Sequence, residues 1–207
     1  MKIYDISPPL HPGIAVWPGD VPFQRTESLR LSNGASVNLS SITLSAHTGA
    51  HADAPSHFSN SGETIDHVDL QAYIGPASVV SISAKEYIRA SDLDGCISQK
   101  PVRLLVRCNP GIDPERFPES FVYFSSQAAE RIAKAGVRLI GTDAPSVDRI
   151  DSKDLAAHHA FASCGTAILE NLDLRGVSDG EYELIALPLR IAGGDGSPVR
   201  AILRERW

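Results

Sequence analysis

Three histidines and an aspartate lie close together in the segment SAHTGAHADAPSHF, residues 45–58. They are His47, His51, Asp53 and His57, in a chain that has only 7 histidines among 207 residues. Imidazole and carboxylate groups together suit zinc above all, with manganese or cobalt as substitutes. The spacing therefore predicts a site for a divalent metal ion. The alternative interpretation is a polar loop with surface histidines.

The segment cannot be a helix of the kind that carries HExxH zinc sites, although His47 and His51 are spaced as in such a helix. Gly49 lies between them and Pro55 follows, and both residues disfavour helix. A fully extended chain from 47 to 57 would spread the ligands over roughly 33 Å, far more than bonds of about 2 Å to one ion allow. We therefore expect a strand to end near His47 and the chain to curl, with Gly49 permitting the bend.

Two or three ligands from one loop leave a metal shell incomplete, so a second segment must contribute. Glu170 ends the apolar segment TAILE, where a lone buried carboxylate is costly unless a metal accompanies it; an ordinary ion pair is the alternative. His158 and His159 lie in a predicted helix, and either could face the site. His11 and His67 stand alone, and we interpret them as surface or capping residues.

Hydrophobic periodicity predicts the elements that must position these residues. In the segment 39–47, Ile42, Leu44 and Ala46 fall on one face and polar residues on the other, which is the pattern of a strand. Further strands are expected at 77–83, 102–108, 121–124, 137–143, 166–170 and 183–191.

A first helix is expected at 125–136. It begins at a serine, carries Glu130 and Lys134 one turn apart, and ends at Gly136. Because a predicted strand precedes it and another follows it, the three elements form a candidate βαβ unit.

A second helix is expected at 151–165, beginning at Asp151 or Ser152 and ending at Gly165. Strands that alternate with helices in this way are typical of an α/β protein with a mixed sheet. No linker or charge block divides the chain, so we expect a single domain over residues 1–207.

Composition excludes several other classes of protein. The net charge of −6 argues against nucleic acid or an anionic membrane as a partner, and no run approaches 18 apolar residues. The segment MKIYDISPPLHPG has no apolar core of the secretory kind. Cys96, Cys108 and Cys164 form no CxxC pair, so we interpret them as reduced thiols of a cytoplasmic protein.

Several segments together resemble one known family. SAHTGAHADAPSHF is similar to the HxGTHxDxPxH loop of the cyclase-type metal hydrolases. The order of further segments is that of the bacterial kynurenine formamidases, or arylformamidases: YDISPPLHPGIAVWPGD, DLQAYIGPASVV, GTDAPSVD, HHAFASCGTAILENLDL and SPVRAILRE. The resemblance runs nearly end to end. It implies an α/β fold whose mixed sheet is partly barrel-like and flanked by helices.

The resemblance implies two zinc ions per subunit. The ligands that it assigns are His47, His51, Asp53, His158 and Glu170. Asp53 and Glu170 would bridge the two ions. His158 is preferred to His159 because it lies twelve residues before Glu170, as in the family.

The implied reaction is the hydrolysis of N-formyl-L-kynurenine to L-kynurenine and formate, a step of tryptophan degradation. A metal-activated hydroxide would attack the formyl carbon, and His57 would act as general acid and base instead of as a permanent ligand. Trp17 begins the segment WPGD, which suits a type II turn that presents the indole to the ring of the substrate. Arg190 or Arg200 could bind the carboxylate of the substrate.

Two positions depart from the family pattern. Ala50 stands where the family often has threonine, which predicts altered hydrogen bonding around the metal loop, and the segment GGDG at 193–196 predicts a looser loop. A related hydrolase of another small amide or lactam, such as isatin, is the alternative within enzymes. A non-enzymatic zinc-binding protein is the alternative outside them. By the same resemblance, the partners are a small-molecule substrate and a second copy in a homodimer.

Overall fold

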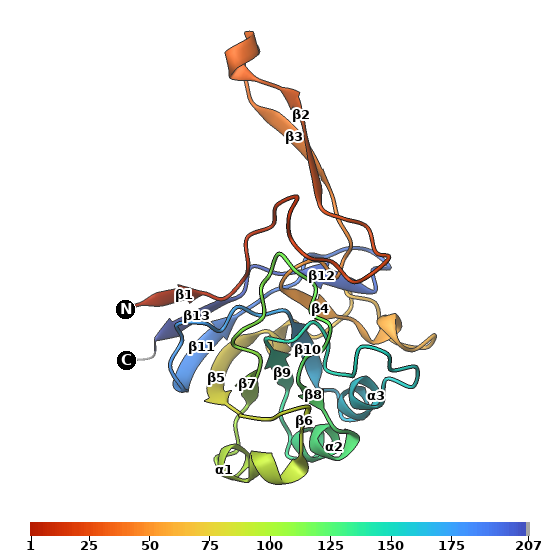
Figure 1. The fold of residues 1–207 in the computed structure, drawn as a ribbon, viewed down its shortest axis with the longest axis vertical. Helices are drawn as coiled ribbons and strands as arrows, with labels where there is room; N and C mark the ends of the chain where they lie inside the picture. The colour runs from red at the N-terminus through yellow and green to blue at the C-terminus, as the bar shows by residue number, and fades with distance from the viewer. Residues whose placement is uncertain (206–207) are drawn as a thin grey trace.

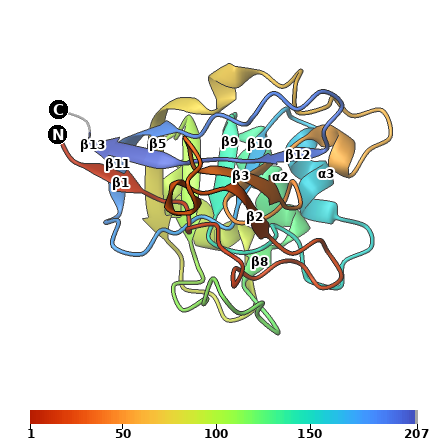
Figure 2. The same ribbon diagram turned by 90° about the horizontal axis from the view of Figure 1, so that it is seen from above.

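The computed structural model describes residues 1–205, and within them the main sheet has nine strands (Figure 1). In sheet order they are β1 (Ile3–Asp5), β13 (Ile202–Glu205), β11 (Gly180–Ile185), β5 (Ile74–Ser81), β7 (Arg103–Arg107), β9 (Leu139–Thr142), β10 (Ala167–Glu170), β4 (His51–Asp53) and β12 (Gly196–Pro198). The pairs from β5 to β10 are parallel, and the outer pairs are antiparallel. Figures 1 and 2 show that the sheet curls. The predicted α/β class with a mixed sheet is confirmed.

Helices α1 (Asp94–Ile97), α2 (Ser126–Lys134) and α3 (Ala156–Ala162) lie together beside one face of this sheet (Figure 1). Leu104 of β7 packs into the core on the side of α2 and α3, whereas its neighbour Leu105 belongs to the core on the other face. Burial on both faces explains why the central strands are continuous apolar runs.

The predicted strands at 77–83, 102–108, 137–143 and 166–170 correspond to β5, β7, β9 and β10. The strand predicted at 183–191 is β11, which begins earlier and ends at Ile185. The short strands β1, β12 and β13 were not predicted. Strands of three or four residues are too short to show a clear alternation.

The candidate βαβ unit is wrong in its first strand. Strand β8 (Tyr123–Phe124) pairs with β6 (Tyr87–Ile88) in a separate ribbon, and the parallel neighbours of β9 are β7 and β10. The predicted start of α2 is confirmed, because Oγ of Ser125 accepts the N–H of Ala128 at 3.2 Å. Gly136 follows the helix with a left-handed φ of 81°.

The predicted strand at 39–47 does not join the main sheet. Its first part is β3 (Leu39–Thr43), which pairs with β2 (Gln24–Leu29) in a ribbon that projects far from the body (Figure 1). The 3-10 turn η1 (Leu31–Asn33) lies at its tip. Every residue of both strands is exposed, and Ile42 is 58% exposed. The alternation identified a strand, but its apolar face does not reach the core of this chain. We call the ribbon from β2 to β3 the arm.

The helix predicted at 151–165 is wrong at its start. Leu155 has a left-handed φ of 44°, so α3 begins only after it. Neither Asp151 nor Ser152 caps the helix. The carboxylate of Asp148 accepts hydrogen bonds at 2.9 and 3.0 Å from two backbone N–H groups of the first turn.

Short 3-10 turns complete the described elements: η2 (Pro55–His57), η3 (Leu70–Ala72) and η4 (Ala90–Leu93). Across residues 1–205, no helix has both the length and the apolar character needed to cross a membrane.

Candidate metal centre

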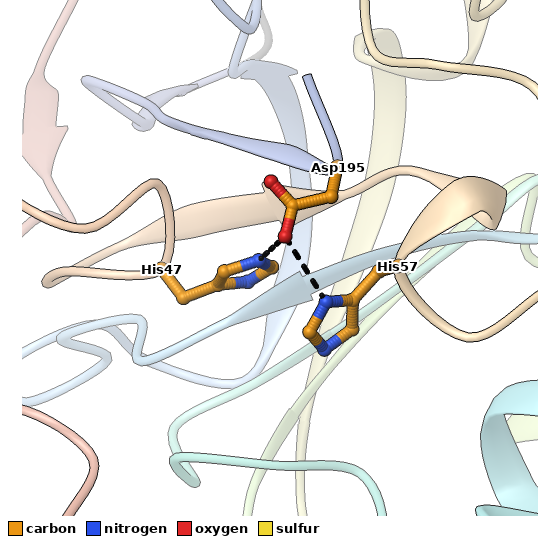
Figure 3. Close-up of side chains that lie close together, drawn as sticks. All are labelled: His47, His57 and Asp195. Atoms are coloured by element: carbon orange, nitrogen blue, oxygen red, sulfur yellow. Dashed lines mark hydrogen bonds and ion pairs between the residues drawn. The ribbon is translucent and has the colours of Figure 1, made fainter. Parts of the chain in front are cut away.

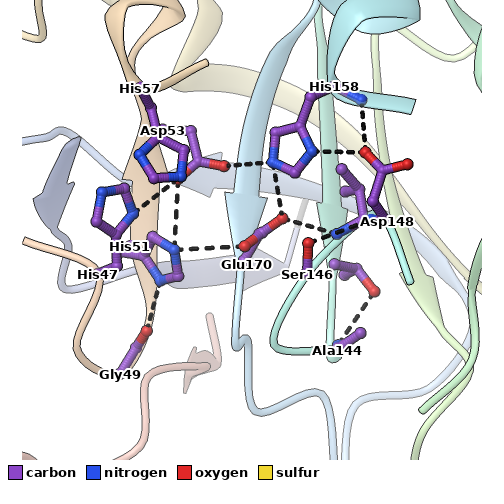
Figure 4. Close-up of polar contacts among 12 residues, drawn as sticks. His47, Gly49, His51, Asp53, His57, Ala144, Ser146, Asp148, His158 and Glu170 are labelled. Carbon is purple, nitrogen blue, oxygen red and sulfur yellow. Dashed lines mark hydrogen bonds and ion pairs between the residues drawn. The ribbon is translucent and has the colours of Figure 1, made fainter. Parts of the chain in front are cut away.

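Strands β4 and β10 bring three of the predicted ligands to one face of the sheet. The strands are antiparallel, with Glu170 opposite His51 and Ile168 opposite Asp53. Because alternate residues of a strand share a face, the side chains of His51, Asp53 and Glu170 converge. Nε2 of His51 lies 3.4 Å from Oδ1 of Asp53 and 3.4 Å from Oε2 of Glu170 (Figure 4).

His47 reaches the same carboxylate from the turn that precedes β4. Its Nδ1 lies 3.1 Å from Oδ1 of Asp53. The chain turns at Gly49, whose φ of 66° favours glycine, and a Cβ at this position would come within 2.7 Å of Cδ2 of Leu10. The strand therefore ends before His47 and the chain curls at Gly49, as the sequence predicts.

His158 approaches the cluster from α3. Its Nε2 lies 3.3 Å from Oδ2 of Asp53 and 3.6 Å from Oε1 of Glu170. His158 is buried, whereas the neighbouring His159 is exposed. The structure thus brings all of the predicted ligands together, and it includes His158 instead of His159.

Two groups of candidate ligand atoms share Asp53. One group is His47, His51 and Asp53, and the other is Asp53, His158 and Glu170; within each, the ligand atoms lie within 4.8 Å of one another. A carboxylate common to both groups is suited to bridging two ions. Glu170 also lies beside a histidine of each group, since it contacts both His51 and His158.

Most of these spacings suit shared ions better than hydrogen bonds. Two ligands bound at about 2.0–2.1 Å to one tetrahedral ion lie about 3.3 Å apart, whereas N–H···O hydrogen bonds are mostly about 2.9 Å long. The contact between His47 and Asp53, at 3.1 Å, is within hydrogen-bond range, but the other contacts described above measure 3.3, 3.4 and 3.6 Å. Oδ2 of Asp53 is buried and, within residues 1–205, makes no hydrogen bond. A buried carboxylate oxygen left in this state is costly unless a cation lies beside it, so these residues fit a metal.

The cluster attracts positive charge. Burial alone would lower the pKa of His51, but Asp53 and Glu170 outweigh it and raise this pKa to about 10. Burial also opposes protonation of His158, and Asp148 and Asp53 nevertheless raise its pKa to about 10. The histidines must release these protons when a metal binds, so we expect metal affinity to fall as the pH falls.

Asp148 and the main chain orient the ligands. Oδ2 of Asp148 lies 2.7 Å from Nδ1 of His158, which leaves Nε2 of that ring facing the cluster (Figure 4). The carbonyl of Gly49 lies 2.8 Å from Nδ1 of His51, and the N–H of Val147 donates to Glu170 at 2.7 Å. Sequence reasoning missed Asp148, whose only signal is its place in the segment GTDAPSVD.

Replacing Asp148 with asparagine should weaken metal binding at the group of Asp53, His158 and Glu170 by about 10- to 100-fold, because His158 loses its charged orienting partner. Metal titration of the apoprotein measures the loss. Asp151→Asn is the matched control, since Asp151 pairs only with exposed Arg149 in the described part of the chain. Equal weakening by both changes would show that Asp148 does not act through His158.

His57 and His47 face a further carboxylate, Asp195, at the exposed side of the cluster (Figure 3). Oδ2 of Asp195 lies 3.2 Å from Nε2 of His47 and 3.5 Å from Nδ1 of His57. The ring centroids of the two histidines are 4.1 Å apart. His57 thus lies beside the two groups that share Asp53 but belongs to neither.

Asp195 comes from the segment GGDG, for which the sequence predicts a looser loop. The looseness of the turn stays a prediction, but the last glycine of the segment lies in the main sheet. Gly196 is buried in β12, where it pairs with Asp53. A Cβ at Gly196 would come within 2.7 Å of Cε1 of His47, so the glycine allows the ring of His47 to pack against the strand. Sequence reasoning missed Asp195, because its partners are distant in the chain.

Burial is the largest influence on His57 and lowers its pKa. Asp53 opposes this effect, and His47 and His158 add to it. A lowered pKa favours the neutral imidazole, which is the form that accepts a proton.

A cavity of about 310 Å³ opens beside the cluster, and His57 and Trp17 both line it. The ring of Trp17 meets the ring of Phe117 edge-on, with centroids 5.1 Å apart. The predicted turn is present, because Asp20 N–H donates to the carbonyl of Trp17 at 2.9 Å and Gly19 has a φ of 91°. Phe117 had no signal in the sequence that would associate it with this cavity.

The fold and this cluster of histidines and carboxylates define the class of the protein. A family model described as "Putative cyclase" matches residues 4–149. The chain belongs to this cyclase family. The proteins similar to it include enzymes, the kynurenine formamidases and isatin hydrolases.

Two curated relatives and two solved structures are similar to this chain over nearly its whole length. The kynurenine formamidase of Bacillus cereus is 46% identical over 200 residues, which cover 97% of this chain and 96% of the relative. The kynurenine formamidase of Bacillus cytotoxicus is 45% identical with the same coverage. A solved structure described as a "potential metal-dependent hydrolase with cyclase activity" has a TM-score of 0.85 and 27% identity, and the match covers 99% of both chains. Isatin hydrolase A of Labrenzia aggregata shares the fold, with a TM-score of 0.83 and 23% identity over 98% of this chain and 93% of that one.

Proposed function

We propose that this protein hydrolyses N-formyl-L-kynurenine to L-kynurenine and formate, with two zinc ions per subunit. The observation that carries the proposal is one cavity lined by candidate metal ligands from both groups, by His57 and by two aromatic rings. The identity to relatives named kynurenine formamidase supports this choice of substrate.

The donor set of the cluster consists of imidazole and carboxylate groups, which suits zinc, with manganese and cobalt as substitutes. His47, His51 and Asp53 would hold one ion, and Asp53, His158 and Glu170 would hold the other. When bound, such ions acidify a water molecule and stabilise negative charge on a carbonyl oxygen.

His57 moves the proton in the proposed reaction. As water attacks the formyl carbon, the neutral ring accepts one of its protons. The ring then donates this proton to the aryl nitrogen as the C–N bond breaks, so that a neutral amine and formic acid leave, and the formic acid releases its proton to solvent as formate. Asp195 lies at Nδ1 of His57, which leaves Nε2 of the ring free to exchange the proton.

Trp17 would bind the aromatic ring of the substrate. The side chain is 38% exposed, lines the cavity and is braced by Phe117. An edge or offset contact between aromatic rings contributes about 1 kcal/mol beyond burial.

The test is hydrolysis of N-formyl-L-kynurenine by purified protein, followed by the absorbance of kynurenine. We expect activity in the zinc-loaded protein, less than about 1% of it after chelation, and recovery when zinc is restored. A zinc-loaded protein that hydrolyses isatin but not the formamide would favour the alternative within the family. A zinc-loaded protein without activity on either compound would favour a binding function.

We further propose that the protein is a homodimer joined through the arm. An isolated two-stranded ribbon is only marginally stable in water. The arm also exposes several apolar side chains, as a surface that binds another protein does. They are Leu29, Leu31, Val37, Leu39 and Ile42. A second copy of the chain would bury them.

Light scattering in solution should then give twice the 22.2 kDa of one chain. Ile42→Glu should shift the mass toward that of a monomer, whereas Glu27→Gln on the same arm should not. A wild-type mass of one chain would exclude the dimer.

We also propose that the protein acts in the cytoplasm. Its three cysteines are free, as is usual in a reducing compartment. Free-thiol titration of the protein purified from the cytoplasmic fraction tests this, and recovery from another fraction would contradict it.

A further inference from the structure

The cavity beside the metal cluster is lined by two chemically different sets of side chains. One set consists of His57 and four of the candidate ligands, which are His47, His51, His158 and Glu170. The other set consists of Trp17 and Phe117 together with two arginines, Arg116 and Arg175. A substrate whose reacting group lies beside the candidate ligands would share the cavity with these arginines.

The two arginines differ in whether they already have a partner. Arg175 is bound by Asp173 through two hydrogen bonds, at 2.8 Å from Nε and 2.7 Å from a terminal nitrogen. Asp173 accordingly raises the pKa of Arg175. This guanidinium is therefore neutralised by its own chain, and a ligand would have to displace a paired carboxylate to reach it.

Arg116 has no such partner. Within the described residues, its guanidinium makes no ion pair and no hydrogen bond, and only its backbone N–H is engaged, with the carbonyl of Asp113 at 3.1 Å. Arg116 lines the main cavity and also an adjoining hollow. The next residue in the chain is Phe117, whose ring contacts Trp17. An unpaired guanidinium is suited to a carboxylate, which it binds through two parallel hydrogen bonds.

We propose that Arg116 binds the α-carboxylate of the substrate and so makes the site selective for formamides that carry an amino acid. The inference rests on the proposed function and adds the residue that recognises the end of the substrate remote from the formyl group. Asp113 also lines the cavity, and its carbonyl accepts the backbone N–H of Arg116, so neighbouring residues present charges of both signs, as the zwitterion of an amino acid requires. Arg190 and Arg200, the candidates from the sequence, do not line the cavity, and Arg200 is paired with Asp5 at 2.8 Å.

The test compares two substrates that differ only in the carboxylate: N-formyl-L-kynurenine and its decarboxylated analogue, N-formylkynuramine. In Arg116→Met, we expect kcat/KM for the amino acid to fall by about 10- to 100-fold, mostly through KM, and the value for the amine to change by less than about threefold. Arg116→Lys should recover only part of the loss, because an ammonium group lacks the paired geometry. Arg175→Met is the matched control, and it should leave the ratio of the two substrates unchanged.

Binding of the product L-kynurenine by calorimetry provides a readout that needs no turnover. We expect Arg116→Met to weaken it by about 10-fold or more. If Arg116→Met affects both substrates equally, or if Arg175→Met alone changes the ratio, the assignment of Arg116 is overturned. A wild-type protein that binds L-kynurenine through Arg116 without hydrolysing either formamide would instead contradict the proposed function and keep this inference.

Discussion

Replacing His57 with alanine should lower kcat for the formamide by roughly two to four orders of magnitude while leaving the metal content unchanged. His57 lies outside the two groups that share Asp53, so the ligand set stays intact without it. The variant loses only the group that transfers the proton to the leaving amine. Metal analysis of the purified variant, together with its turnover, measures both effects.

The control for this change is His67→Ala. His67 is an exposed histidine that does not line the cavity.

Loss of metal in His57→Ala would contradict the proposed role of His57. It would place His57 among the ligands, within the group formed with His47 and Asp195, and the proton transfer would then need another residue.

Replacing His158 with alanine should remove about one of the two proposed ions per chain and reduce activity by at least about 100-fold, because the candidate group of Asp53, His158 and Glu170 would lose one of its ligands. The adjacent His159 provides a strict control on the same helix. It is exposed, and we expect His159→Ala to keep both ions and nearly full activity.

Metal content per chain after dialysis distinguishes the two variants. The unfolding temperature of each, measured in the metal-free state, separates loss of a ligand from damage to α3. If His159→Ala lost an ion and His158→Ala did not, the ligand assignment would be wrong by one position.

The geometry that the sequence predicted is that of the loop whose ligands are close together in the chain. The curl at Gly49 followed from the spacing of His47 and Asp53 and from the short bonds of a metal ion. Glu170 could also be predicted as a ligand, because a carboxylate in an apolar strand needs a compensating charge. The central strands were also predictable, since burial on both faces leaves long apolar runs.

The remaining features depend on contacts between distant segments. Asp195 contacts His47 from the other end of the chain, and a lone aspartate among glycines carries no sign of this. The start of α3 was misplaced because rules for helix capping consider the residues next to the helix. Here the cap is Asp148, on the far side of the left-handed Leu155. In the arm, alternation identified β3 but could not show what its apolar face contacts.

The position of β4 between β10 and β12 also bears on how the chain folds. Asp53 pairs with Ile168 on one side and with Gly196 on the other, and both partners are synthesised long after it. Contacts this far apart in sequence form slowly, because a long loop must close before they contribute. A nascent chain that has only His47, His51 and Asp53 therefore offers an ion an incomplete and unshielded set of ligands. We therefore expect the proposed ions to be loaded late, after the sheet has closed, and to stabilise the closed sheet because they would bind the native state alone.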